Sequence, residues 1–276
     1  MRPPGSDLRQ WLVVAGLLAG CGKTHVPVES VPELGYPECA DSDSFVTVVA
    51  RGRLRSGPYS SEVGVSEKFE LSRSSCGYVF RSRQEWSLAA SDIEVWYDSM
   101  LTPVWAWKRM TVPAGQLPDG HADVRRYELR TGPVYITHRD AQGILTHERL
   151  LEGGRSRAAP GAAVSAVIGP GRGVLTPWIE RAHLAVREKT KALVLDFRAL
   201  VETLEVVTLE RNEDEYEPTL GRQVRVYTFG GKETVFADGE DVVIGDLAGM
   251  RPSAALSSPE PPSPPTYSEP DPRSPP

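Results

Sequence analysis

The feature that most constrains the fold of this chain is a repeated alternation of apolar and polar residues over short runs. Alternation with period two is typical of strands that have one buried and one solvated face. Because turn residues such as those at 139–143 separate consecutive runs, the pattern predicts an antiparallel meander. Eight such runs follow one another from residue 45 to residue 151: FVTVVARGRL, SEKFELSR, GYVFRSRQEWSL, DIEVWYD, VWAWKRMTV, RRYELR, VYITHR and ILTHERLL.

The sequence pattern of the later part of the chain predicts further strands and one clear helix. QVRVYTF and KETVFA flank Gly230-Gly231, which can both take the positive φ of a tight hairpin turn. A helix is expected over about 176–186, since Thr176 can cap it and the next residue is proline. Residues 197–203 fit either a short helix or a strand. The fold class is therefore mainly β: an antiparallel meander that forms a curved sheet or half-barrel, with one or two short helices.

The first 21 residues carry the three parts of a bacterial export signal. Two arginines precede the apolar run WLVVAGLLA, which is too short to span a bilayer. Leu18-Ala19-Gly20-Cys21 then resembles the lipobox of bacterial lipoproteins. That resemblance implies that residues 1–20 are a cleaved signal peptide and that Cys21 becomes an acylated N-terminus, held in the membrane by its fatty chains. Gly22 follows, where the family's inner-membrane retention signal has Asp, which implies an outer-membrane anchor facing the periplasm or the cell surface.

The same stretch does not satisfy the alternative interpretation as a nucleotide-binding loop. GLLAGCGKT ends in Gly-Lys-Thr, but a phosphate loop requires glycine at the position of Leu17. The prolines at 27, 32 and 37 also exclude the helix that must follow such a loop. Loss of residues 1–20 removes two arginines and one aspartate, so the formal net charge changes from −6 to −7. We therefore expect neither a nucleotide nor a nucleic-acid partner.

Composition divides the mature chain into three parts. Residues 21–40 are rich in proline and predict a tether, residues 41–250 predict the β-rich domain, and residues 251–276 hold ten of the 24 prolines and predict a disordered tail. No other stretch of 18 or more apolar residues is present, so nothing else is expected to span the membrane. The predicted meander is similar in architecture to the periplasmic curved half-barrels that include the lipoprotein carriers of the Lol system.

Two cysteines remain once Cys21 is lipidated. Cys39 and Cys76 form an even pair in an oxidising compartment, which favours a disulfide over two free thiols. The bridge would close a loop of about 38 residues, worth about 4 kcal/mol in the chain-entropy model. Neither cysteine has a Cys or His neighbour at the spacing of metal ligands, so we expect no zinc.

Four tryptophans are concentrated within about twenty residues of the predicted sheet: Trp86, Trp96, Trp105 and Trp107. The last two share one face of a strand, because side chains alternate. Aromatic side chains on a concave sheet can receive an acyl chain or a glycan, and they can equally form the core. The sequence leaves both interpretations open and makes these four residues the candidate ligand-binding set.

Two other sequence patterns suggest a binding site but do not define its set of ligating residues. His138 and His147 flank a hairpin turn and lie opposite each other if the loop is Gln142-Gly143, but on different faces if the loop has three residues. AVIGPGRGVLTPW at 166–178 places glycines before a helix, whose N-terminus and Arg172 could hold an anion; the alternative is a flexible turn. The acidic stretch at 210–218 lacks the ligand spacing of a calcium loop and predicts a solvated strand end.

The sequence contains no recognisable catalytic motif. G-x-S-x-G, H-E-x-x-H and a plausible Cys-His pairing are all absent. We expect a lipid-anchored envelope protein whose β domain binds a lipid or another envelope protein, or serves as a structural part, with no cofactor, no metal and no assigned catalytic residue. The alternative is an envelope hydrolase that uses unpatterned acids such as Asp196, Glu202 or Glu205; it requires two of them to converge in a cleft.

Overall fold

The computed structural model describes ten stretches of the chain, all within the compact unit Ser42–Pro276. The predicted signal peptide, the lipidation site Cys21, the tether with Cys39 and residues 254–276 of the predicted tail lie outside these stretches. Within them, no helix is long and apolar enough to cross a membrane. The described stretches are residues 47–56, 64–74, 76–86, 89–112, 123–129, 134–140, 142–151, 163–184, 189–199 and 201–253.

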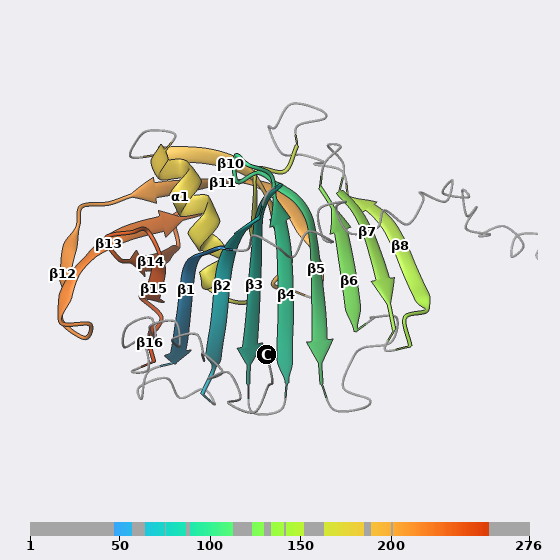
Figure 1. Ribbon diagram of the computed structural model, residues 1–276, viewed down its shortest axis with the longest axis horizontal. Helices are drawn as coiled ribbons and strands as arrows, with labels where there is room; N and C mark the ends of the chain where they lie inside the picture. The colour runs from blue at the N-terminus through green and yellow to red at the C-terminus, as the bar shows by residue number, and fades with distance from the viewer. Residues whose placement is uncertain are drawn as a thin grey trace, which may run out of the picture. The chain divides into compact units, whose positions relative to one another are not determined.

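Nine strands form a large antiparallel sheet in which β1 to β8 follow one another in chain order (Figure 1). Each of the eight predicted runs contributes one of these strands, so the predicted meander is confirmed. The ninth strand, β16, pairs with β1 at the other edge. The bounds are β1 (Thr47–Ser56), β2 (Ser66–Ser74), β3 (Gly77–Glu85), β4 (Ala90–Tyr97), β5 (Pro103–Thr111), β6 (Val124–Glu128), β7 (Val134–Arg139), β8 (Leu145–Leu151) and β16 (Met250–Pro252).

A second sheet of seven strands follows in the chain. Its order is β15-β14-β13-β11-β10-β9, with β12 paired to β13; β9 and β10 are parallel, and the other pairs are antiparallel. Gly230 and Gly231 join β13 to β14 with φ of 61° and 69°, which confirms the predicted tight turn. The bounds are β9 (Ala166–Ile168), β10 (Lys189–Asp196), β11 (Thr203–Arg211), β12 (Glu215–Glu217), β13 (Arg222–Phe229), β14 (Glu233–Ala237) and β15 (Val243–Asp246).

The structure decides one open alternative and shifts one predicted boundary. The described residues between β10 and β11 form a bend, so 197–203 holds no second α-helix and its last residue begins a strand. Arg251 and Pro252 belong to β16, although the sequence placed them in the tail, because their backbone pairs with β1. The predicted α-helix is present as α1 (Thr176–Leu184), and the 3₁₀-helix η3 (Gly173–Leu175) leads into it.

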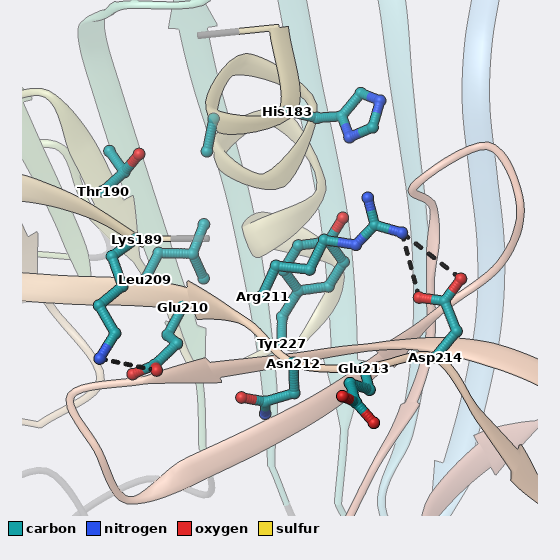
Figure 2. Close-up of a pocket in the computed structure, with 11 residues that line it drawn as sticks. His183, Lys189, Thr190, Leu209, Glu210, Arg211, Asn212, Glu213, Asp214 and Tyr227 are labelled. Atoms are coloured by element: carbon teal, nitrogen blue, oxygen red, sulfur yellow. Dashed lines mark hydrogen bonds and ion pairs between the residues drawn. The ribbon is translucent and has the colours of Figure 1, made fainter. Parts of the chain in front are cut away.

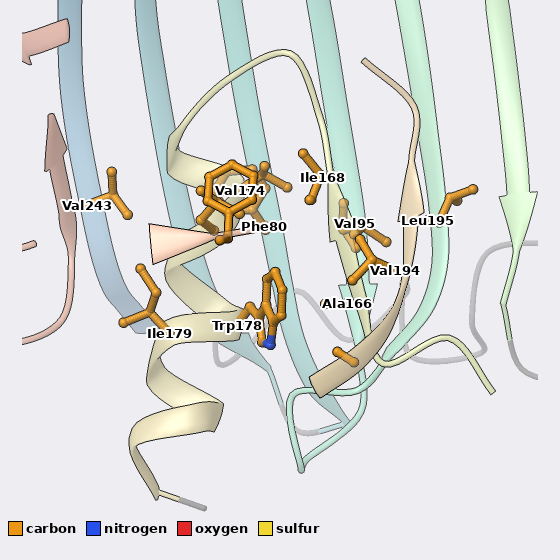
Figure 3. Packing of buried hydrophobic residues seen from close by; sticks show 14 of the residues in the cluster. Phe80, Val95, Ala166, Ile168, Val174, Trp178, Ile179, Val194, Leu195 and Val243 are labelled. Atoms are coloured by element: carbon orange, nitrogen blue, oxygen red, sulfur yellow. The ribbon is translucent and has the colours of Figure 1, made fainter. Parts of the chain in front are cut away.

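The core lies between α1 and the inner face of the large sheet, which is the face that carries Leu71, Phe80, Val95 and Ala106. Figure 3 shows Trp178 and Ile179 of α1 close to Phe80, with residues of β9 and β10 completing the layer. These side chains are almost completely buried. The strands therefore form a curved half-barrel whose concave side, next to β3 and β4, is filled by the helix of the same chain.

The opposite, outer face of the large sheet is polar. Because side chains alternate, the residues that separate the core positions of β1 to β3 point to this face. They include the half-buried Glu70 and five exposed basic residues: Arg51, Arg53, Lys68, Arg81 and Arg83. The predicted alternation of buried and solvated positions is therefore present, with basic residues concentrated on the solvated side.

Candidate functional site

Charged side chains gather on the inner face of the large sheet, away from the helix. The strand register places Lys108, Arg125, His138 and His147 directly opposite one another on β5, β6, β7 and β8. Glu202, from the turn before β11, reaches this row and is only 3% exposed. Arg125 and Lys108 are buried at 1% and 0%. We call this group the Glu202 cluster.

The Glu202 carboxylate is fully engaged within the cluster. Arg125 Nη1 donates to Glu202 Oε1 at 2.6 Å, and the Tyr127 hydroxyl donates to the same oxygen at 3.1 Å. Arg149 Nη2 donates to the other oxygen. Burial by itself raises the pKa of Glu202, but the charges and hydrogen bonds of the two arginines outweigh burial and lower it. The carboxylate therefore stays ionised and joins the second sheet to β6 and β8.

Two further members of the cluster have strongly shifted pKa values. Burial, with a contribution from the charge of Arg125, lowers the pKa of Lys108 to about 8, and its ammonium donates to the carbonyl oxygen of Phe197. Burial and the same arginine charge lower the pKa of His138 to about 4, so this imidazole is neutral at pH 7. These pKa shifts result from burying Lys108 and His138 next to the charge of Arg125. Neither residue lines either of the two hollows described below.

The three acids of the hydrolase alternative do not share a pocket. Asp196 forms an ion pair with Arg198 at 2.6 Å, Glu202 is bound as described, and Glu205 is exposed on β11. None of them lines either of the two open hollows described below. The pair of converging acids that this alternative needs is therefore not found at these positions.

The two histidines of the β7–β8 hairpin lie opposite each other. His138 and His147 are register partners with ring centroids 5.3 Å apart. Arg139 pairs with Leu145, as in the longer loop, and a register shift between His138 and Arg139 brings the two histidines opposite each other. Within the part of the chain that the structure describes, no group of three His, Cys, Asp or Glu residues could hold a metal ion. The arginines and glutamate of the Glu202 cluster surround the pair instead.

The glycine-rich segment before α1 binds a carboxylate of the same chain. Glu67 of β2 accepts hydrogen bonds from the backbone N–H groups of Arg172 at 2.7 Å and Gly173 at 3.1 Å, and from the Ser82 hydroxyl at 2.9 Å. A Cβ on Gly171 would lie 2.2 Å from Glu67 Oε1. The N–H groups that could hold an external anion at this helix end are therefore bound to Glu67, and the segment where the chain crosses is tightly packed.

A polar hollow of about 760 Å³ opens beside the C-terminal half of α1 (Figure 2). His183 projects from the helix toward it, while Lys189 and Glu210 form an ion pair of 2.8 Å along one side. Arg211 and Asp214 form another at 3.1 Å. The residues that line it include one histidine but no serine or cysteine. A lining of this composition suits the binding of a polar ligand.

A second and larger hollow of about 1270 Å³ lies over the outer face of the large sheet, and we call it the outer hollow. Strands β1 to β5 and the second sheet both contribute to it. Its charged lining consists of seven basic residues and four acidic ones: Arg51, Arg53, Lys68, Arg81, Arg83, Arg109, Arg222, Glu70, Asp92, Glu94 and Asp238. The lining is therefore basic in a chain whose formal net charge is −6.

Three of the four candidate tryptophans, Trp96, Trp105 and Trp107, are on the outer face of the large sheet. Trp96 and Trp105 are cross-strand partners on the outer side of β4 and β5, and the indole N–H of Trp96 donates to Glu94 at 2.7 Å. Of the four, Trp107 alone lines one of the two hollows described, and Arg109 stacks 5.8 Å from its ring centroid. Trp86 follows β3 and is half-buried. A ligand-binding role for these residues stays a prediction.

Cys76 is exposed and disulfide-bonded. Cys39 lies outside the described residues, so the pairing of these two cysteines stays a prediction, as does lipidation of Cys21.

Sequence reasoning singled out Glu202, His138 and His147 separately, but it missed that they meet in one cluster. It also missed the basic outer hollow. A signal for the cluster was present, because alternation places Lys108 on the same face as the buried Ala106, and Arg125 on the same face as Tyr127. Charges at core positions of a strand indicate an internal partner. That the partner is Glu202 depends on how the second sheet returns, which local patterns do not contain.

Three chains of solved structures match this chain, and two of them are described here. No family model and no curated protein matches the sequence. A DUF1089 family protein from Pseudomonas aeruginosa is 14% identical with a TM-score of 0.37, covering 64% of this chain and 87% of its own. A β-barrel-like protein of domain of unknown function DUF1849 from Brucella abortus is 10% identical with a TM-score of 0.44, covering 74% and 93%. Neither is described as a Lol carrier, so that resemblance stays a prediction, and no function is carried over to this chain.

Proposed function

We propose that this chain is a lipid-anchored protein of the bacterial cell envelope, held in the outer membrane through Cys21, whose β domain binds a partner or ligand without covalent chemistry. The lipobox-like residues 18–21 support the anchor. The domain contributes two surface hollows lined by charged and polar residues and an interior in which charged groups bind one another.

The observation that carries the non-catalytic part is that two buried acids, Glu67 and Glu202, are bound by groups of the same chain. Glu67 binds the end of η3, and Glu202 binds Arg125 and Arg149. A carboxylate that is held by two or three donors inside the protein is not available as a general base or nucleophile. The features that first suggest chemistry are therefore explained as contacts that stabilise the fold.

The packing also favours binding at the surface over transport of a lipid inside the half-barrel. The concave side next to β3 and β4 is filled by Trp178 and Ile179 of α1, which are 5% and 0% exposed. Both described hollows are open and are lined largely by charged residues. A protein partner or a charged surface fits these hollows better than an acyl chain does.

Metabolic labelling with palmitate tests the anchor. Cys21→Ala is expected to abolish labelling and to leave an uncleaved precursor on a gel, because both acylation and cleavage require the cysteine. Cys39→Ala is the matched control and is expected to keep the label. Label that persists in Cys21→Ala would contradict the anchor, and native protein whose intact mass still includes residues 1–20 would do the same.

A further inference from the structure

Three basic side chains lie side by side on the outer face of the large sheet. Arg53, Lys68 and Arg83 are register partners on β1, β2 and β3, so each stands directly opposite the next. Like charges placed opposite each other on neighbouring strands destabilise a sheet. Arg51 adds a fourth exposed cation two positions from Arg53. A stable fold does not require this row, which suggests that it serves a contact outside the chain.

The acids near this row are bound to other groups. Glu94 pairs with Arg81 at 2.8 Å, and Asp92 pairs with Arg83 at 3.0 Å. The Glu70 carboxylate accepts a hydrogen bond from Ser72, and Asp238 accepts from backbone N–H groups of its own turn. Within the part of the chain that the structure describes, Arg51, Arg53 and Lys68 have no ion pair. These three unpaired cations lie on β1 and β2, while Glu70, the register partner of Arg51, keeps its negative charge on the same face.

An aromatic side chain lies in the same hollow. Trp107 is half-buried there, with the Arg109 guanidinium 5.8 Å from its ring centroid. Tryptophan next to basic residues is the composition that proteins use at the headgroup level of a membrane. The combination of an indole and a group of cations therefore fits an anionic lipid surface.

We propose that the outer hollow docks the β domain against anionic phospholipid headgroups of the membrane that holds the Cys21 lipid. The inference rests on the proposed anchor, which brings this face close to the bilayer. β1 begins 26 positions after Cys21, a length that spans at most about 90 Å. The chain as a whole is acidic and is repelled by an anionic surface, so the basic face determines which side of the domain turns to the membrane.

Lysine labelling of the full mature protein tests this orientation. The protein is reconstituted into vesicles of phosphatidylcholine alone, or of equal parts phosphatidylcholine and phosphatidylglycerol, and treated with an amine-acetylating reagent. Peptide mass spectrometry then follows Lys68 together with Lys191 and Lys232, which are exposed on β10 and in the β13–β14 turn. We expect Lys68 to react about fivefold more slowly in the anionic vesicles, and to recover at about 0.5 M NaCl, while the other two lysines are unchanged.

Charge variants keep Lys68 as the reporter. Arg51→Gln with Arg53→Gln is expected to remove most of its protection, because two neighbouring cations are lost. Lys191→Gln with Lys232→Gln removes the same charge elsewhere and is expected to leave the protection of Lys68 intact. Equal labelling of Lys68 in both kinds of vesicle, or equal loss of protection in both variants, would overturn the docking.

Two further measurements separate the possible failures. Soluble polyglutamate is added without vesicles; if it protects Lys68 and anionic vesicles do not, the hollow binds an acidic polypeptide and membrane docking is overturned. Intact mass of the same sample reports lipidation independently. An anchored protein with unprotected Lys68 overturns the docking alone, whereas an unlipidated protein that anionic vesicles protect supports the docking and contradicts the anchor.

Discussion

Glu202 stabilises the contact between the second sheet and the large sheet. Its carboxylate is the counter-charge of Arg125 and Arg149 on two strands of the large sheet. Glu202→Gln keeps the shape but leaves the buried Arg125 without that charge, so the free energy of unfolding should fall by about 3 kcal/mol. Glu205→Gln, on the exposed side of the same region, should change it by less than about 0.5 kcal/mol. Urea denaturation of both variants measures the difference. Equal free energies of unfolding would show that the Glu202 cluster does not stabilise the contact between the two sheets.

His138 should make the stability of the protein depend on pH between about 4 and 6.5. Its pKa is about 4 in the folded protein, against an ordinary value of 6.5. Between these values the unfolded chain binds a proton that the folded chain does not, so stability falls as pH falls through this window. The contribution between pH 7 and pH 5 is about 2 kcal/mol.

The variant His138→Asn isolates this effect. It should lose that part of the pH dependence, because asparagine has no group that titrates in this range. Chemical denaturation of wild type and variant at pH 7 and pH 5 gives the comparison. The two proteins should differ in the change between the two pH values, whatever the cost of the substitution at pH 7. The same slope in both would contradict the assignment to His138.

At the scale of elements, the contact between β2 and η3 depends on the absence of a side chain at Gly171. A Cβ at Gly171 would approach Glu67 Oε1 to 2.2 Å, whereas one at Gly239 would meet nothing within 4 Å. Gly171→Ala should therefore displace the carboxylate from the N–H groups of Arg172 and Gly173, at a cost of about 2 kcal/mol or more. Gly239→Ala is the matched control and should be within about 0.5 kcal/mol of wild type. Thermal unfolding of the two variants decides between a packed contact and a tolerant turn.

The strands could be predicted because each one is determined by residues that are close together in the sequence. The sites could not be predicted, because their residues come from positions that are far apart in the sequence. Alternation in β1 to β8 and the paired glycines at 230 and 231 determine strands and a turn within a few residues of themselves. Arg172 meets Glu67 across 105 positions, and Arg125 meets Glu202 across 77. Which carboxylate meets which cation depends on the register of two complete sheets, and no short pattern encodes it. The row of basic residues on the outer face was visible as exposed positions, but its lateral alignment required the register.

The described part of the molecule places most of its apolar groups inward, and the unpaired cations of the outer hollow face outward. The helix fills the concave side of the half-barrel, and the Glu202 cluster joins the two sheets beyond the helix. The outer hollow and the hollow beside α1 both open at the surface. The outer hollow is therefore accessible from outside the domain. The anchor predicted at Cys21 would limit the distance between this hollow and the membrane.

The disulfide is the feature that connects the anchor to the fold. Cys76 is disulfide-bonded, and the chain has three cysteines. If the sulfur of Cys21 carries a lipid through a thioether, it is not available for a bridge, so we propose Cys39 as the partner. The loop of about 38 residues then stabilises the fold by about 4 kcal/mol in the chain-entropy model. Cys39→Ser, Cys76→Ser and the double variant should each lose this amount, because either substitution breaks the same bond.

Urea denaturation of the three variants, together with non-reducing peptide mass spectrometry of the wild type, tests the pairing. A double variant that loses clearly more than either single variant would argue against a shared bridge. A Cys39→Ser protein as stable as wild type, with Cys76 still bonded, would assign the bridge to Cys21. Because one sulfur cannot carry both bonds, that result would also contradict the lipid anchor, so this measurement tests the compartment as well as the fold.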